Sequence, residues 1–240
     1  MPRADPRRSP CPARRRVPAA LCLLAALALP AWAARPLNTD DANIVDEKAC
    51  QLESWVRSSR DGHEQWALAG CNPLGGAEFS LGGSRLHADT AHARATLAQV
   101  KLQLHPLAGH GWGLALAAGT QSLRGAAGRE RDDYLNLPWT VALGADRYLH
   151  LNAGWVRHRA LHVARASWGA GGEWPLDGAL IALGEAYGER GAPTRYQLGL
   201  RLWLLPQRMQ LDATYGNTLH GRGGRWFSVG LRLLSPPFLP

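Results

Sequence analysis

Short segments with alternating apolar and polar residues recur along this sequence, and they constrain its fold more than any other feature. Residues 196–204 are an example, because Tyr or Leu occupies every even-numbered position while Gln197, Gly199 and Arg201 lie between them. Successive side chains of a β-strand point to opposite faces, so such a segment has one apolar face. The pattern therefore predicts an all-β fold.

Twelve segments carry this pattern. They are residues 50–58, 63–71, 77–88, 93–105, 111–122, 134–143, 147–158, 161–174, 178–188, 194–205, 208–216 and 225–234. Residues 34–240 provide about 17 residues for each strand and its connection, which fits the tilted ~10-residue strands of membrane-spanning barrels. We predict an antiparallel transmembrane β-barrel of about 12 strands over residues 34–240.

The connections predict a topology. If both termini are periplasmic, every even-numbered connection is short, as residues 144–146 and 205–208 are. The odd-numbered connections then include the long loops, for which residues 123–133 and 217–225 are polar, glycine-containing candidates.

The hairpin around Pro206 predicts which face points inward. A type I turn centred on Pro206–Gln207 pairs Leu204 with Met209, Leu202 with Leu211 and Arg201 with Asp212. Because apolar residues meet apolar residues and charge meets charge, we place Arg201 and Asp212 together in the lumen, the interior of the barrel.

Other charged residues on the same face predict a lumen charge cluster. Its members are Glu53, Lys101, Glu173, Glu185, Arg201, Asp212 and Arg232. A ladder of internal ion pairs that satisfies these charges is the first interpretation, and a role in gating or solute contact is the second.

Aromatic residues fall near the ends of the predicted strands, as in the two aromatic girdles of membrane barrels. They are Trp112, Trp139, Tyr148, Trp168, Trp174, Tyr196, Tyr215, Trp226 and Phe227. The alternative is a soluble β-sandwich, but its outer face would then be an adhesive surface of Leu and Val on strand after strand.

Residues 1–33 have the pattern of a cleaved export signal. Six Arg precede an apolar stretch at residues 17–30, and Ala31 and Ala33 supply the small residues before the expected cleavage site after Ala33. Removal of six Arg and one Asp lowers the formal charge from +8 to +3. The remaining basic residues are scattered, so a nucleic-acid partner is not expected.

Cys50 and Cys71 remain after cleavage, in a compartment where a disulfide persists. They bracket one predicted hairpin. With the hairpin centre between Arg60 and Asp61 they face each other, whereas a three-residue turn centred on Asp61 leaves them one step out of register. A metal site is not expected, because the pair has no CxxC spacing and no His at ligand spacing.

Residues typical of enzymes do not form a defensible site. A hydrolase needs a Ser or Asp beside a His on adjacent strands, and the nine His show no such spacing. His158 and His162 are too far apart on a strand to share a metal, at about 13 Å. We expect no enzyme activity and no cofactor.

Several stretches resemble a family of outer-membrane transporters of the phenol-degradation meta-pathway type. The opening octet Arg35–Ala42 (RPLNTDDA) carries most of the resemblance, and residues 185–191, 196–201, 210–216 and 229–232 add to it. The resemblance implies an outer-membrane barrel that passes small, hydrophobic or aromatic compounds.

Three functions remain to be distinguished. The first is a narrow porin-like pore or transporter in a Gram-negative envelope, because twelve strands leave a lumen that inward side chains can constrict. The second is a structural or adhesive barrel without flux, and the third an outer-membrane hydrolase. The partners expected for the first are outer-membrane lipid, the barrel assembly machinery and a small-molecule solute.

Overall fold

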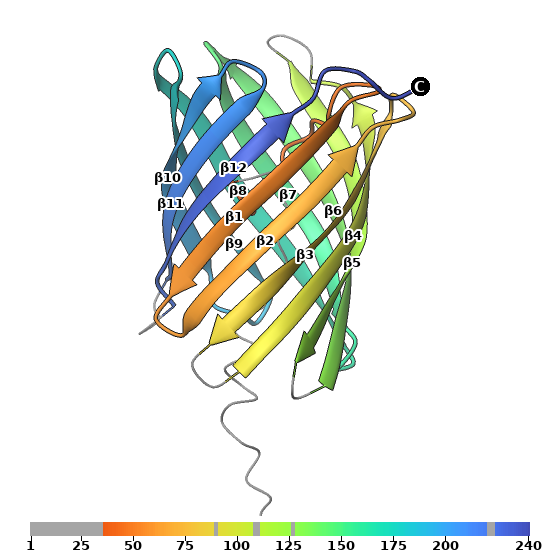
Figure 1. The fold of residues 1–240 in the computed structure, drawn as a ribbon, viewed down its shortest axis with the longest axis vertical. Coiled ribbons are helices and arrows are strands. Elements are labelled where there is room, and N and C mark those ends of the chain that lie inside the picture. Colours follow the sequence, from red (N-terminus) through yellow and green to blue (C-terminus); the bar gives the residue numbers. More distant parts are fainter. Residues whose placement is uncertain (1–35, 89–90, 108–110, 126–127, 220–223) are drawn as a thin grey trace, which may run out of the picture.

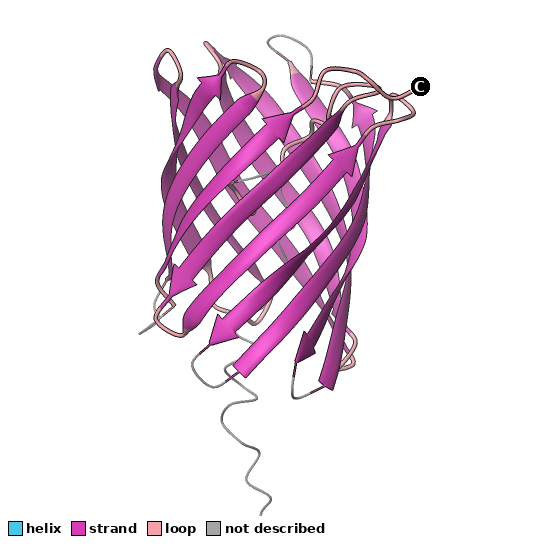
Figure 2. Ribbon diagram, in the orientation of Figure 1, coloured by secondary structure: helices cyan, strands magenta, loops and turns pink. Residues whose placement is uncertain are grey.

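The computed structural model describes residues 36–88, 91–107, 111–125, 128–219 and 224–240. Twelve antiparallel strands pair in sequence order, and the first strand pairs with the last, so the sheet closes into a barrel. Figures 1 and 2 show this single tilted wall of strands. No described residue belongs to a helix long and apolar enough to cross a membrane. The expected signal at residues 1–33 lies outside the described residues.

Each of the twelve predicted strands is present. They are β1 (Cys50–Ser59), β2 (Gly62–Cys71), β3 (Ala77–Ala88), β4 (Ala91–His105), β5 (Trp112–Gly125), β6 (Gly128–Gly144), β7 (Arg147–His158), β8 (Val163–Asp177), β9 (Leu180–Glu189), β10 (Arg195–Leu205), β11 (Met209–Thr218) and β12 (Trp226–Leu234). The start of β1 lies beside the end of β12, so residue 50 and the C-terminus are at the same end of the barrel, the upper end in Figure 1.

The long loop predicted over residues 123–133 is wrong. β5 continues to Gly125 and β6 begins at Gly128, so the connection itself is short. These strand ends extend past the apolar belt of the barrel, where outward positions also carry polar residues such as Arg124 and Arg131. Without an apolar face, the alternation that reveals a strand disappears.

The hairpin between β10 and β11 matches the predicted register except at its turn. Leu202 faces Leu211 and Arg201 faces Asp212, but a bulge puts Leu205 rather than Leu204 opposite Met209. Gln207 has φ of 57°, which suits the third position of a type II turn and not the predicted type I turn.

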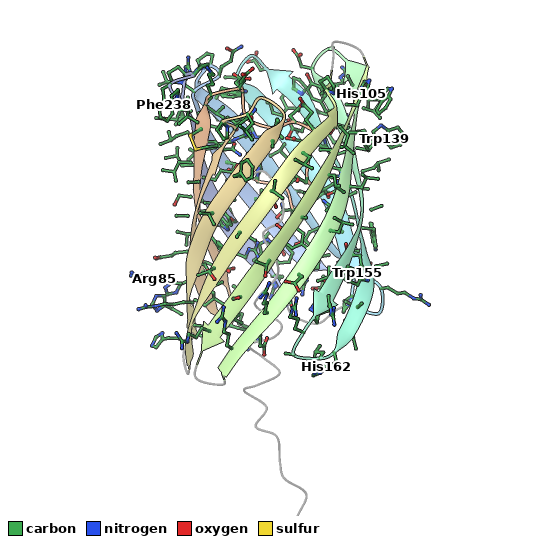
Figure 3. All side chains as sticks on the ribbon, turned by 90° about the vertical axis from the view of Figure 1, so that its right-hand side faces the viewer. Arg85, His105, Trp139, Trp155, His162 and Phe238 are labelled. Carbon is green, nitrogen blue, oxygen red and sulfur yellow. A yellow bond between two sulfur atoms is a disulfide. The ribbon has the colours of Figure 1, made fainter. Side chains whose placement is uncertain are left out.

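The outer surface is apolar along most of the strands, with large aromatic residues towards both ends. Figure 3 shows Trp139 near one end and Trp155 towards the other. Trp112, Trp168, Trp174, Tyr215 and Phe227 are exposed as well. Two of the expected girdle residues face inward instead: Trp226 is buried, and Tyr148 stacks on the buried His150. Because Phe227 follows Trp226 directly, only one of the two can point outward.

Cys50 and Cys71 are opposite each other, with a two-residue turn at Arg60–Asp61. A disulfide joins them. It fixes the ends of β1 and β2 at the end of the barrel that holds the C-terminus.

An apolar cluster fills part of the interior, which the sequence analysis did not predict. Trp55 and Trp66 stack with ring centroids 5.5 Å apart. The other members are Leu68, Leu86, Ala93, Ala95, Leu97, Leu123, Tyr134 and Val156, on β2 to β7. One side of the lumen is thus packed like the core of a soluble protein.

Leu200→Arg tests the outward face. Leu200 is 46% exposed on β10, between Ala182 and Ala213 of the neighbouring strands. If this face meets hydrocarbon, the substitution destabilises the inserted barrel by about 2 to 4 kcal/mol, as measured by urea unfolding in lipid vesicles. The control is Leu161→Arg in the β7–β8 connection, which is already exposed and is expected to change little. Equal losses in the two variants would contradict the assignment.

Candidate functional site

Residues 36–49 cross the lumen of the barrel up to Val45 and then reach its end, where residues 46–48 are exposed. Thr39, Asp40 and Ala42 are at most 2% exposed, and Leu37 and Val45 are also buried. We call residues 36–49 the lumen segment. It precedes β1 in the chain and includes most of the octet Arg35–Ala42.

The lumen segment follows the inside of the wall, meeting one strand after another. Its hydrogen-bond partners are, in order, Gln197 of β10, Glu185 of β9, Asn152 of β7, Thr140 of β6 and Glu78 of β3. As the segment advances from Pro36 to Val45, the strands that it contacts run backwards in number, from β10 to β3.

Glu185 holds the start of the segment. Its two carboxylate oxygens accept the backbone N–H groups of Asn38 and Thr39 at 2.7 and 2.6 Å, and the Asn38 side chain donates a further bond at 2.9 Å. Hydrogen bonds to an ionised acceptor are stronger than neutral ones. The carboxylate thus satisfies two consecutive amides that have no strand partner.

Uncharged side chains satisfy other backbone groups of the segment. Asn152 accepts the N–H of Asp40 at 2.8 Å and donates to its C=O at 2.7 Å. Thr140 accepts the N–H of Ala42 at 2.8 Å. These bonds substitute for a β-ladder over residues 36–45, whereas Lys48 and Ala49 form backbone bonds with Asn72.

Lys101 of β4 forms the charged contact with the segment. Its ammonium lies 2.8 Å from Asp40 Oδ1 and 3.5 Å from Asp41 Oδ1, and both Lys101 and Asp40 are buried. Burial raises the pKa of Asp41, but the neighbouring positive charges, led by Lys101, and the N–H of Asn43 together outweigh burial and lower that pKa below its ordinary value. Removing one partner of a buried pair costs about 3 to 5 kcal/mol, because the other charge is left uncompensated.

Two glycines of β8 make room for the segment. A Cβ at Gly169 would lie 2.7 Å from Thr39 Oγ1 and 3.3 Å from Thr39 Cβ, and the nearest atoms to it all belong to Thr39. A Cβ at Gly171 would also approach Thr39 Cβ, at 3.4 Å. The wall is therefore shaped to the segment at these positions.

The seven residues of the predicted lumen charge cluster all have inward positions, but they do not form one group. Arg201 donates to both oxygens of Glu173 at 2.8 Å, and Arg232 lies 3.5 Å from Glu53. Asp212 is buried opposite Arg201 on the next strand. Lys101 and Glu185, by contrast, bind the lumen segment.

Sequence reasoning missed the partners of Lys101 and Glu185. Asp40 and Asp41 were noticed only as part of the octet, and Glu78, which accepts the N–H of Val45 at 2.9 Å, was not singled out. One signal was available, since Lys101 is one of two lysines in the sequence and lies on an inward face that requires acidic partners.

Thr140, His150 and Glu173 place a hydroxyl, an imidazole and a carboxylate in a row. Thr140 Oγ1 is 3.0 Å from His150 Nδ1, and His150 Nε2 is 3.7 Å from Glu173 Oε1. The hydroxyl is fully buried and already accepts the N–H of Ala42. A substrate carbonyl has no access to it, so the row acts as support for the lumen segment.

A cavity of about 350 Å³ lies between the segment and the end of the barrel away from the C-terminus. Asn38 of the segment forms part of its lining, with Tyr187, Arg195 and the β7–β8 and β9–β10 connections. His158 also lines the cavity. Its Nδ1 lies 3.2 Å from a carboxylate oxygen of Asp132, and its Nε2 lies 2.8 Å from a carboxylate oxygen of Glu189. The cavity can hold one small molecule.

A family comparison identifies the chain. Residues 20–234 match the sequence model of a family described as uncharacterised conserved protein UCP029691. The chain belongs to this family. The UCP029691 description differs from that of the phenol-degradation meta-pathway family, so membership in the latter stays a prediction. No curated protein matches the sequence.

Solved structures of outer-membrane barrels resemble this UCP029691 protein in fold. The KdgM porin is 13% identical with a TM-score of 0.55, over 76% of this chain and 98% of the porin. The NanC porin is 10% identical with a TM-score of 0.54, over 77% and 98%. An outer membrane channel from Pseudomonas putida F1 is 13% identical with a TM-score of 0.53, over 84% and 98%. At these identities the likeness concerns the fold alone.

Gly169→Val tests whether the segment is packed against β8. The larger side chain overlaps Thr39, and overpacking costs about 1 to 3 kcal/mol, so the segment is displaced more often. A cysteine replacing the buried Ala42 then reacts with a maleimide about tenfold faster. Ala170→Val, on the outward face of the same strand, is the control and leaves the rate unchanged. Slow labelling in both variants would contradict the packing.

Proposed function

We propose that this UCP029691 protein is a porin-like pore or transporter for small solutes in the outer membrane, closed at rest by its lumen segment. The observation that carries the proposal is the placement of residues 36–49 across the lumen of a porin-like barrel. The apolar outer face with aromatic residues towards both ends supports a membrane location. Outer-membrane lipid and the barrel assembly machinery are its proposed partners.

The contacts of the lumen segment favour a reversible closure. Gln197 and Thr140 each form one hydrogen bond with it and Asn152 forms two, and water or a polar solute can replace these bonds. With cleavage after Ala33, the segment has a free end that begins only two residues before Pro36. It can therefore move out of the lumen without breaking the barrel wall.

The cavity beside the segment suggests the class of solute. Arg165 and Arg195 offer positive groups, Glu130, Asp132 and Glu189 offer negative ones, and Leu123 and Leu161 offer apolar contacts. This mixture suits a small solute with an aromatic or other apolar body and polar substituents. Small aromatic compounds are therefore the first solutes to test.

A structural barrel without flux is the second candidate function. The observation that favours it is the interior itself, where the apolar cluster around Trp55 and Trp66 occupies one side and the lumen segment crosses the rest. In that case the segment is a permanent part of the core.

Conductance across a planar bilayer distinguishes these functions. The refolded chain from Ala34 onward is expected to be closed most of the time, whereas a variant lacking residues 34–45 gives steady unitary currents. A synthetic peptide of residues 34–45 added to the variant reduces them. The deletion removes the contacts with Gln197, Glu185, Asn152, Thr140, Lys101 and Glu78, but it removes no residue of the barrel strands.

Folding controls keep the result interpretable. Both proteins are first shown to be inserted by their heat-dependent shift in gel mobility and their β-sheet circular dichroism. If neither the chain from Ala34 onward nor the variant lacking residues 34–45 conducts although both are inserted, the result would contradict a pore and favour the structural barrel. Equal steady currents in both would contradict closure by the segment.

A further inference from the structure

Four arginines form a continuous row on the outside of the barrel. Arg85 of β3 faces Arg94 of β4, Arg94 faces Arg124 of β5, and Arg124 faces Arg129 of β6. All four occupy outward positions and are exposed. Figure 3 shows the Arg85 side chain extending away from the wall. We call these four residues the arginine row.

The charges of the arginine row are not neutralised by the protein. Among the described residues, Arg85, Arg94 and Arg124 make no ion pair, and Arg129 donates only a long bond of 3.4 Å to Ser122. Like charges directly opposite each other on neighbouring strands destabilise a sheet. Anions from outside the chain would therefore relieve the repulsion within the row.

The row lies where the apolar outer face ends. On β3, exposed Phe79 and Leu81 precede Arg85 on the same face, and on β4 Arg94 is followed on that face by Val100 and Leu102. In Figure 3, Arg85 lies near the same height as Trp155, at the end of the barrel away from Phe238 and the C-terminus. This height corresponds to the headgroup region of a membrane.

Three histidines extend the basic surface beyond the row. His63, His87 and His92 face each other on β2, β3 and β4. The rings of His63 and His87 stack with centroids 5.0 Å apart, and the Nδ1 atoms of His87 and His92 are 3.1 Å apart. Their N–H groups are further donors for the same anion.

We propose that the arginine row binds the phosphate groups of the phosphorylated glycolipid in the outer leaflet of the outer membrane. The guanidinium fork matches phosphate oxygens in bidentate geometry, and a glycolipid with several phosphates can bridge neighbouring arginines. Its acyl chains then lie against Phe79, Leu81 and Leu102. The inference rests on the proposed function, because an outer-membrane location with periplasmic termini places the row in the outer leaflet.

The test uses the refolded chain from Ala34 onward in a neutral detergent, titrated with lipid A and followed by native mass spectrometry. R85Q/R94Q/R124Q is expected to raise the dissociation constant by about 100-fold, since each arginine near an anionic surface contributes about fivefold. R147Q/R190Q/R208Q removes the same charge from exposed positions elsewhere and is expected to change it less than about threefold. We expect dephosphorylated lipid A to bind the wild type and R85Q/R94Q/R124Q equally weakly.

Three outcomes would overturn the proposal: unchanged binding in the row variant, an equal loss in the control variant, or an equal loss towards phosphatidylglycerol micelles. The last would mean that the row senses negative charge in general. Failure of the proposed function is seen separately. In that case the protein is absent from outer-membrane fractions or silent in bilayers, whatever its affinity for lipid A.

Discussion

A closed barrel of twelve strands encloses every second side chain of its wall, and each polar group among them needs a partner away from bulk water. In this protein the inward face combines an apolar cluster with buried charges such as Lys101, Glu185 and Glu78. The lumen segment meets that need. The Asp40 carboxylate of the segment pairs with Lys101, and backbone N–H groups of the segment donate hydrogen bonds to the carboxylates of Glu185 and Glu78. Wall and segment are thus complementary, and neither is satisfied alone.

This complementarity divides the interior into three regions. The cluster around Trp55 and Trp66 packs one side, the lumen segment crosses the middle, and the cavity remains between the segment and the end away from the C-terminus. Room for the segment comes mainly from Gly169, where any side chain would overlap Thr39. A solute that enters the cavity meets Asn38 of the lumen segment.

The wall could be predicted from the sequence because its signal is local. Alternation identifies each strand where one face is apolar, and the Arg201–Asp212 pair follows from a short hairpin whose register the chain determines nearby. The same signal failed over residues 123–133, where the residues after Leu123 carry no apolar face although β5 continues to Gly125 and β6 begins at Gly128. It also failed for Trp226, since its neighbour Phe227 competes for the outward position.

The lumen segment could not be predicted in this way. Residues 36–49 have no strand periodicity, and their partners are up to 161 residues away, as for Pro36 and Gln197. Glu185 was expected among paired charges of the wall, but it binds backbone amides, which carry no sequence signature. The arginine row was hidden for a similar reason, because Arg85, Arg94, Arg124 and Arg129 come together only through the registers of three hairpins.

A reversible lock on the lumen segment tests the central claim most directly. Thr39→Cys with Gly169→Cys, in a background without Cys50 and Cys71, places two cysteines with Cβ atoms about 3.3 Å apart, close to the spacing of a disulfide. Single-channel current is recorded from the same inserted protein before and after reduction. Closure by the segment predicts silence in the oxidised state and openings once the bond is reduced. Identical currents in both states would contradict it.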